Sequence, residues 1–318
     1  MTLRIGVDIG GTKTSAAVVD DDGRIVRRAR RDTPAQDVEA IAASVVEVVR
    51  ELIDADDDPL ATVGVACAGF VDAAGETVLF APNLAWRDTP LQAVLQEQLG
   101  VPVVLENDAN AAAWGEFRYG PARDVDDMLL ITVGTGVGGG VINDGHLLRG
   151  AHGVAAEVGH LRVVPGGIRC GCGNRGCWEM YASGTALERE ARELVRAESP
   201  HAARLTELCG GDPERLRGRM VTAAAEEGDR AALELLEELG TWLGEGIASL
   251  VAVLDPALVV VGGGLSAAGD MILEPARAAY ERQVTGRGHR PIGQIVPATL
   301  GNDAGMIGAA DLAALRRG

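Results

Sequence analysis

The sequence predicts an α/β protein with two sheet-centred domains and a cleft between them. Three observations support this prediction. The chain has 318 residues, which suits two domains of roughly 150 residues each. Segments with strand and helix periodicity alternate along it. A strand, a glycine-rich turn, a second strand and an Asp-Gly turn occur in this order twice, which indicates two related domains.

The first copy of this pattern covers residues 1–23 and opens a domain that we place at residues 1–120. Its first strand is expected at residues 3–8. Periodicity then predicts helices at 38–53 and 108–117, and buried strands at 62–71 and 101–106. A closing helix at 304–315, within the segment 303–318, is expected to pack on this domain.

The second copy starts at Met128 and opens a domain placed at residues 121–302, with a zinc-binding insert at 157–179. Pro121 and the polar residues 123–127 mark the crossing between the domains. Helices are expected at 184–198 and 229–254, and a strand at 258–261 leads into a glycine run.

Composition argues against several classes of partner. The net charge of −17 disfavours nucleic acid and anionic membranes. Aromatic residues make up 3%, so a platform that stacks bases or sugars is not expected. No apolar run reaches the roughly 20 residues of a membrane span, and no signal-peptide pattern opens the chain. We expect a cytoplasmic protein with reduced thiols, in which Cys67 and Cys209 are ordinary buried residues.

One imidazole and three sulfurs form a candidate metal site between residues 157 and 179. The ligands would be His160, Cys170, Cys172 and Cys177. This set is typical of a closed tetrahedral zinc site, and four protein ligands leave no open position, so the zinc should be structural. Glu157 and Glu179 flank the cluster. The metal would therefore fix two carboxylates beside a polar binding site.

The first glycine-rich turn is a candidate phosphate site. Its residues are Asp8, Gly10, Gly11, Thr12 and Lys13. Backbone N–H groups of a tight glycine turn can approach phosphate oxygens, and the threonine and the chain's only lysine add a hydroxyl and a cation. Asp8, at the strand end, is placed to hold a phosphate-bound Mg²⁺ through water. The spacing is not that of a Walker A loop, and a simple hairpin turn is the alternative.

The second glycine-rich turn contains Gly134, Thr135, Gly136 and Gly138. It matches G-x-G-x-x-G, but a dinucleotide fingerprint requires a helix next, and here a strand and an Asn-Asp-Gly turn follow. We therefore interpret it as a second phosphate-contacting hairpin. The run Gly262, Gly263 and Gly264 follows a buried strand and could let a purine lie against the backbone. A plain strand–helix turn is the alternative.

Asp108 is the candidate general base. It lies at a strand–helix junction in the segment E-N-D-A-N-A-A-A, and an aspartate can accept a hydroxyl proton during phosphoryl transfer. The alternative role for Asp108 is a helix N-cap, which is common for aspartate. Asn107 beside it could bond a polyol.

Together these motifs resemble the ROK family of sugar kinases and repressors, within the actin/hexokinase-like ATPase superfamily. D-I-G-G-T-K, E-N-D-A-N-A-A-A, G-T-G-x-G-G-G, E-x-G-H and C-x-C-G-x-x-G-C-x-E occur in the family's order across essentially the whole chain. Residues 79–86 and 178–184 are similar to those of bacterial ATP-dependent glucokinases of actinobacterial type. The resemblance implies transfer of a phosphoryl group from ATP, with Mg²⁺, to the 6-hydroxyl of glucose.

The resemblance also implies roles at matching positions. Asp108 would take the proton from the 6-hydroxyl. The residues on the sugar would be Gly69, Asn83, Asn107, Asp108, Glu157, His160 and Glu179. The two glycine-rich turns would hold the phosphates, and residues 262–264 the adenosine. Family members usually form dimers or tetramers, so a homo-oligomer is expected.

Three alternatives stay open at this point. The sugar could be N-acetylglucosamine, N-acetylmannosamine or fructose. A sugar-responsive repressor is disfavoured by the acidic charge and by a phosphate motif whose strand begins at Leu3. A non-catalytic zinc module is disfavoured by the pair of phosphate hairpins. Polyphosphate could replace ATP, although relatives that use it tend to lack the cysteine cluster.

Overall fold

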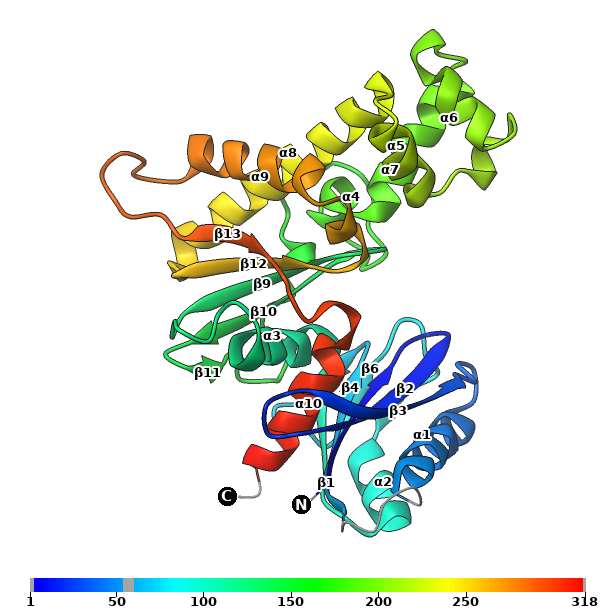
Figure 1. Cartoon of the computed structure of the whole chain (residues 1–318), viewed down its shortest axis with the longest axis vertical. Helices are drawn as coiled ribbons and strands as arrows, with labels where there is room; N and C mark the ends of the chain where they lie inside the picture. The colour runs from blue at the N-terminus through cyan, green and yellow to red at the C-terminus, as the bar shows by residue number, and fades with distance from the viewer. Residues whose placement is uncertain (1–2, 54–59, 317–318) are drawn as a thin grey trace. The chain divides into compact units, whose positions relative to one another are not determined.

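The computed structural model describes residues 3–53 and 60–316, and the chain divides into two compact units (Figure 1). The first unit holds residues 1–130, 139–156 and 298–318, and the second holds residues 131–138 and 157–297. Residues 139–156, which the sequence places in the second domain, pack with the first unit. A packing unit need not coincide with a domain, so the domain limits at 120–121 and 302–303 stay predictions.

The first unit is built on a five-stranded sheet in the order β3-β2-β1-β4-β8. Its strands are β1 (Leu3–Ile9), β2 (Lys13–Val19), β3 (Ile25–Asp32), β4 (Leu60–Cys67) and β8 (Val103–Asn107). The first three form the predicted antiparallel meander, whereas β1, β4 and β8 are parallel. The carboxyl ends of three parallel strands therefore share one edge, which is where α/β sheets commonly bind ligands.

Helices cover both faces of this sheet (Figure 1). They are α1 (Val38–Ile53), α2 (Leu91–Leu99), α3 (Asp108–Tyr119) and α10 (Ala304–Leu315), the last preceded by η5 (Gly301–Asp303). Ile5, Val7 and Ile9 share one apolar core with residues of α1 and α2. Residues between them on β1 face α10: a Cβ added at Gly6 would lie 1.8 Å from the Met306 carbonyl oxygen. Helix α10 therefore lies directly on the strand backbone.

Helix α3 begins at Asp108 and is fastened to α10 by a buried carboxylate. Asp311 of α10 accepts hydrogen bonds from Trp114 Nε1 at 2.9 Å and from the Tyr119 hydroxyl at 2.6 Å. Burial, and then the hydrogen bond to Asp311, raises the pKa of Tyr119 to about 12. Both donors belong to α3, so the position of Asp108 is tied to the packing of α10.

One predicted strand, at residues 62–71, is wrong in its extent. β4 ends at Cys67, and β5 (Phe70–Val71) belongs to a separate three-stranded sheet with β6 (Val78–Phe80) and β7 (Arg87–Thr89). The chain leaves the first sheet because the N–H of Gly69 bonds the carbonyl of Cys67 at 2.8 Å, which makes a tight turn. A Cβ at Gly69 would lie 2.6 Å from the Phe80 carbonyl oxygen, so the turn requires glycine.

A second five-stranded sheet has the order β11-β10-β9-β12-β13. Its strands are β9 (Met128–Val133), β10 (Val137–Asn143), β11 (His146–Leu147), β12 (Leu258–Gly262) and β13 (Gln294–Pro297). Strands β9 and β10 contribute residues to both units. The second glycine-rich turn joins β9 to another strand and not to a helix, which confirms the rejection of a dinucleotide fingerprint.

The helices of the second unit lie within or after the segment 157–179. They are α4 (Glu179–Ala182), α5 (Gly184–Arg196), α6 (Ala203–Leu208), α7 (Gly218–Glu226), α8 (Arg230–Leu254) and α9 (Asp270–Gln283), with short 3-10 helices η1 (Val158–His160), η2 (Pro200–Ala202), η3 (Pro213–Arg215) and η4 (Gly264–Ala268). The side chains of Ser183 and Asp229 cap α5 and α8, which start and end within two residues of the predicted limits. Within the described part of the chain, no helix has the length and apolarity to cross a membrane.

Candidate active site

Strand register brings the candidate residues of the first unit to one edge of its sheet. Asp8 on β1 pairs with Ala66 on β4, and Ala66 pairs with Glu106 on β8. One residue further, Asn107 ends β8 and Asp108 begins α3. The carboxylates of Asp8 and Asp108 consequently lie near enough for the charge of Asp108 to raise the pKa of Asp8.

The structure separates the two roles considered for Asp108. Asn107, and not Asp108, caps α3, because its side chain accepts the N–H of Asn110 at 3.0 Å. Asp108 accepts the N–H of the adjacent Ala109 at 3.0 Å. Burial raises the pKa of Asp108, although its hydrogen bonds oppose this shift. A carboxylate with a raised pKa is a stronger proton acceptor near neutral pH, as a general base requires.

The pKa of Asp8 is also shifted from its ordinary value. Burial, followed by the charge of Asp108, raises the pKa of Asp8 to about 6. Two neighbouring carboxylates that are partly buried favour a bound cation, which would relieve both their repulsion and their desolvation. Oxygen ligands of this kind suit Mg²⁺ carried by a phosphate group.

Asn107 has a second contact that links two predicted sugar residues. Its Nδ2 donates to the carbonyl of Gly69 at 3.1 Å, so it holds the turn after β4 against the end of β8. Asn83 is exposed and borders the first glycine-rich turn, since a Cβ at Gly11 would lie 3.5 Å from Asn83 Cβ. The first unit therefore gathers Gly69, Asn83, Asn107 and Asp108 near the turn after β1.

Sequence reasoning missed a buried ion pair next to Asp108. Glu106 is 4% exposed and accepts hydrogen bonds from Arg149 Nε at 2.7 Å and from Asn110 Nδ2 at 3.1 Å. Arg149 is 43 residues away in the chain, so no spacing rule connects the two. The sequence offers one signal of this pair: Glu106 ends a buried strand, and a buried carboxylate requires a partner. The pair fixes the strand end from which Asp108 projects.

The glycines of the first turn are not required by the protein around them. Gly10 and Gly11 lack positive φ angles, and the nearest atoms to an added Cβ lie 3.4 and 3.5 Å away. Open backbone next to Asp8 allows a ligand oxygen to approach the N–H groups. Thr12 is exposed, and Lys13 forms an ion pair with Asp32 on β3.

In the second unit, the turn between β9 and β10 is held by the start of α5. The carbonyl of Gly134 accepts the N–H of Gly184 at 2.7 Å. A Cβ at Gly136 would lie 2.7 Å from Glu179 Oε2, whereas one at Gly134 would meet nothing within 4 Å. The turn thus contacts one predicted sugar residue and leaves the backbone at Gly134 open.

The glycine run after β12 has two different explanations. Gly263 has a φ of 88°, and a Cβ there would lie 2.5 Å from the Val133 carbonyl oxygen, so the fold requires glycine. At Gly264, an added Cβ would meet nothing within 4 Å. The strand–helix turn therefore explains Gly263, and space for a ligand remains an explanation for Gly264.

The four predicted zinc ligands come together in the second unit. Their ligand atoms all lie within 4.8 Å of one another. Cys170 Sγ lies 3.6 Å from His160 Nδ1, and Cys172 Sγ lies 3.6 Å from Cys177 Sγ. Zinc bonds of about 2.0–2.3 Å at tetrahedral angles place ligand atoms about 3.5–3.8 Å apart, so these two separations suit a zinc ion held by the cluster. Cys67 and Cys209 are buried elsewhere, as the sequence predicts.

The ligand geometry orients neighbouring side chains. Because His160 presents Nδ1 to the sulfur atoms, its Nε2 is left to bond another group. Glu179 Oε1 lies 2.9 Å from Cys170 Sγ and 3.4 Å from His160 Nδ1. Trp178, which is 0% exposed, donates to the carbonyl of Trp242 at 2.8 Å and anchors the cluster to α8.

Comparison with known proteins identifies the family to which this arrangement belongs. The chain belongs to the ROK family, whose model matches residues 4–316. It is 45% identical to the glucokinase of Streptomyces coelicolor over 98% of each chain. It is 37% identical to the glucokinase of Thermotoga maritima, over 97% of this chain and 96% of the relative.

A solved structure gives the same result. The ROK family glucokinase of Streptomyces griseus, in complex with glucose and AMPPNP, matches with a TM-score of 0.88 at 46% identity. The match covers 99% of this chain and 100% of that chain. These similarities confirm the predicted family and its actin/hexokinase-like fold.

Proposed function

We propose that this protein is a glucokinase, which transfers a phosphoryl group from ATP to the 6-hydroxyl of glucose and releases glucose 6-phosphate and ADP. Similarity to glucokinases over nearly the full chain supports the proposal. The structural observation that carries it is the pair of carboxylates, Asp8 and Asp108, at the shared end of parallel strands beside an open glycine turn.

Asp108 would act as the general base. It accepts the proton of the 6-hydroxyl while the hydroxyl oxygen bonds to the γ-phosphorus of ATP. The bond between that phosphorus and the bridging oxygen of ADP breaks, and ADP leaves with the bridging oxygen. The raised pKa of Asp108 suits this role, because the residue gains a proton more readily than an ordinary carboxylate.

The donor would be held by the two glycine-rich turns. Backbone N–H groups of the two turns would bond the phosphate oxygens, except those of Gly10 and Gly134, which donate to the carbonyls of Lys13 and Gly136. Residues 262–264 would lie along the adenosine. Mg²⁺ bound with ATP would neutralise phosphate charge, and Asp8 would hold it through water.

The sugar hydroxyls would be bound by Glu157, His160 and Glu179 in the second unit, together with Gly69, Asn83 and Asn107 in the first. A glutamate suits a polyol because its carboxylate can accept hydrogen bonds from two hydroxyls. A zinc ion held by the four cysteine and histidine ligands would have no chemical step of its own. Its effect would be to keep His160 and Glu179 in position.

We further infer that the protein works in the cytoplasm as a homo-oligomer. All five cysteines are unpaired with one another, which suits a reducing compartment. The oligomer follows from the family resemblance.

The test is a coupled ADP-release assay with glucose, N-acetylglucosamine, N-acetylmannosamine and fructose, each with ATP or polyphosphate as donor. We expect the highest kcat/KM with glucose and ATP. A clear preference for an N-acetylhexosamine would show that this sugar, and not glucose, is the substrate. Absence of turnover with every sugar would refute the kinase proposal.

A further inference from the structure

A groove of about 660 Å³ on the first unit extends beyond the residues of the glycine-rich motif. Asp8, Gly10, Thr12 and Lys13 line it on one side. Arg28 and Arg30 of β3 also line it, together with the residues that begin α10. The family motif accounts for the β1–β2 turn, but it assigns no role to the arginines of β3.

Register places Arg30 on the same line across the sheet as Asp8. Asp8 pairs with Ser15 on β2, and Ser15 pairs with Arg30 on β3. Residues directly opposite one another in antiparallel strands point to the same face. Neighbouring strands are about 4.8 Å apart, so the backbones of Arg30 and Asp8 are separated by roughly 10 Å. An arginine side chain spans part of that distance and leaves room for a phosphate group.

The three cations of the groove differ in their partners. Lys13 is paired with Asp32, and Arg28 forms a two-pronged pair with Asp303 at 2.7 and 2.6 Å. Arg30 is exposed, and among the described residues its guanidinium has no hydrogen bond or close ion pair, although its charge helps to lower the pKa of Asp32. Of the described cations that line this groove, Arg30 is therefore the one whose donors are free for a ligand.

We propose that Arg30 binds a phosphate group of the phosphoryl donor in this groove, an inference that rests on the proposed kinase function. A guanidinium can donate two parallel hydrogen bonds to phosphate oxygens. A protein of net charge −17 repels an anionic donor, so a free local cation beside the open glycine turn has a clear purpose. The backbone N–H groups of the turn carry no net charge, and Arg30 supplies a positive charge beside them.

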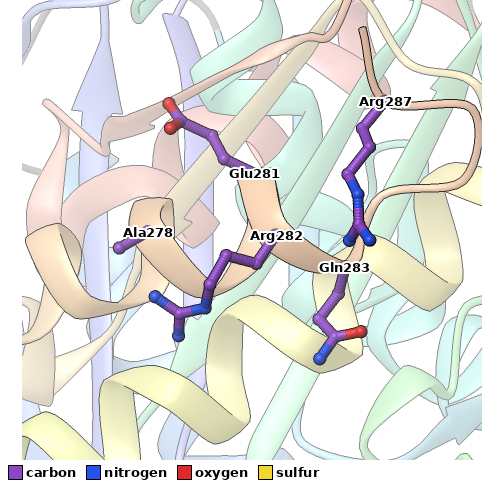
Figure 2. A pocket seen from close by; sticks show the side chains of 5 residues that line it. All are labelled: Ala278, Glu281, Arg282, Gln283 and Arg287. Atoms are coloured by element: carbon purple, nitrogen blue, oxygen red, sulfur yellow. The ribbon is translucent and has the colours of Figure 1, made fainter.

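A second pocket with arginines makes a useful contrast. Arg282 and Arg287 line a hollow of about 800 Å³ at the end of α9, with Ala278, Glu281 and Gln283. Figure 2 shows that their guanidinium groups do not converge on one point, and Glu281 supplies an opposing charge nearby. No phosphate-binding turn lines this hollow, so we assign the donor to the groove beside Asp8.

The test compares Arg30→Met with Arg31→Met. Arg31 is the next residue of β3 and pairs with Glu51 of α1 at 2.6 Å, so its replacement removes the same charge on the other face of the sheet. We expect Arg30→Met to raise the KM for MgATP about tenfold or more and to leave the KM for glucose unchanged. Arg31→Met should change neither, and Arg30→Lys should recover part of the loss.

A binding measurement separates this inference from the kinase proposal. Inorganic tripolyphosphate with Mg²⁺ is titrated into each variant by calorimetry, with adenosine as a probe without phosphate. Arg30→Met should weaken tripolyphosphate binding about tenfold and leave adenosine binding unchanged. If the wild-type protein turns over no sugar but shows this pattern, the groove assignment stands and the kinase proposal falls. Equal affinities for tripolyphosphate in the wild type, Arg30→Met and Arg31→Met would overturn the role of Arg30.

Discussion

The two units hold their candidate polar residues by different means. In the first unit, Asp8, Asn107 and Asp108 lie at strand ends or at a helix start, so the backbone ladder fixes them. In the second, regular structure in the described residues 157–178 is limited to η1 and two isolated bridges. There the four predicted ligands converge within 4.8 Å instead. One unit positions its side chains by secondary structure, and the other by the convergence of one histidine and three cysteines.

This difference predicts different responses to mutation. In the first unit, the effect of changing one polar residue should stay local, because the strands and helices around it remain. In the second, loss of one ligand should release the metal and disturb the whole insert, because metal binding and local folding are one event.

The largest expected effect is on catalysis by Asp108. Asp108→Asn should lower kcat by about 10²–10⁴-fold, the usual contribution of a general base. The free energy of unfolding should not fall, since Asn107 supplies the helix cap. Coupled ADP release and urea denaturation measure the two quantities. A variant with wild-type kcat would remove Asp108 as the base.

The next effect tests the metal. Cys172→Ser should lower the bound zinc well below one ion per chain and raise the KM for glucose about tenfold or more, with a lower Tm. The matched control is Cys209→Ser, which changes a buried thiol outside the cluster and should keep its zinc. Metal analysis, kinetics and thermal melting provide the readouts. Full glucose affinity in zinc-free protein would contradict the metal's positioning role.

A third prediction concerns pH and Asp8. Its folded pKa of about 6 exceeds the ordinary value of 3.8, so the folded state binds the proton more tightly than the unfolded state. The contribution of Asp8 to the free energy of unfolding of the wild type is therefore fully present below pH 4 and is lost as the pH rises through 6. Without Mg²⁺ at pH 7, the free energy of unfolding of Asp8→Asn should therefore exceed that of the wild type by about 3 kcal/mol. This figure uses about 1.4 kcal/mol for each unit by which the pKa is raised.

Urea denaturation of both proteins at pH 4 and pH 7 tests this sign. The difference between the proteins should shrink towards pH 4. If the wild type is as stable as Asp8→Asn at pH 7, burial does not destabilise the ionised carboxylate of Asp8.

The smallest effect is expected at Asn107. Asn107→Ala removes the helix cap and the hydrogen bond to Gly69, and should lower the free energy of unfolding by about 1 kcal/mol. Asn107→Asp keeps an oxygen for the cap but loses the donor to Gly69. Comparing the two variants by urea denaturation separates the contributions. Identical losses would show that the cap adds nothing.

Features that depend on neighbours in the chain could be predicted from the sequence. The two glycine hairpins and the clustering of one histidine with three cysteines are examples, since these four residues lie between His160 and Cys177. Features that depend on distant residues could not. The Glu106–Arg149 pair joins positions 43 residues apart. The difference between Arg30 and Arg28 is also not visible in the sequence, because the partner of Arg28 is the distant Asp303.

Two errors in the predicted elements have local physical causes. The strand expected at 62–71 stops at Cys67, because the backbone bond from Gly69 to Cys67 turns the chain while the apolar pattern continues. Helices α6 and α7 were not predicted because both are shorter than ten residues and are separated by a Gly-Gly-Asp-Pro segment. Short helices in such a context depend on packing rather than on their own periodicity.

The position of α10 has a consequence for synthesis of the protein. β1 ends at Ile9, but the helix that lies on it begins at Ala304. At about 5–20 residues per second, a ribosome needs roughly 15–60 s to reach that helix, and throughout this time the α10 face of the nascent sheet has no cover. Ala17 and Val19 are among the residues left uncovered. The nascent chain should therefore depend on chaperones until α10 emerges, and slower translation should lengthen that dependence.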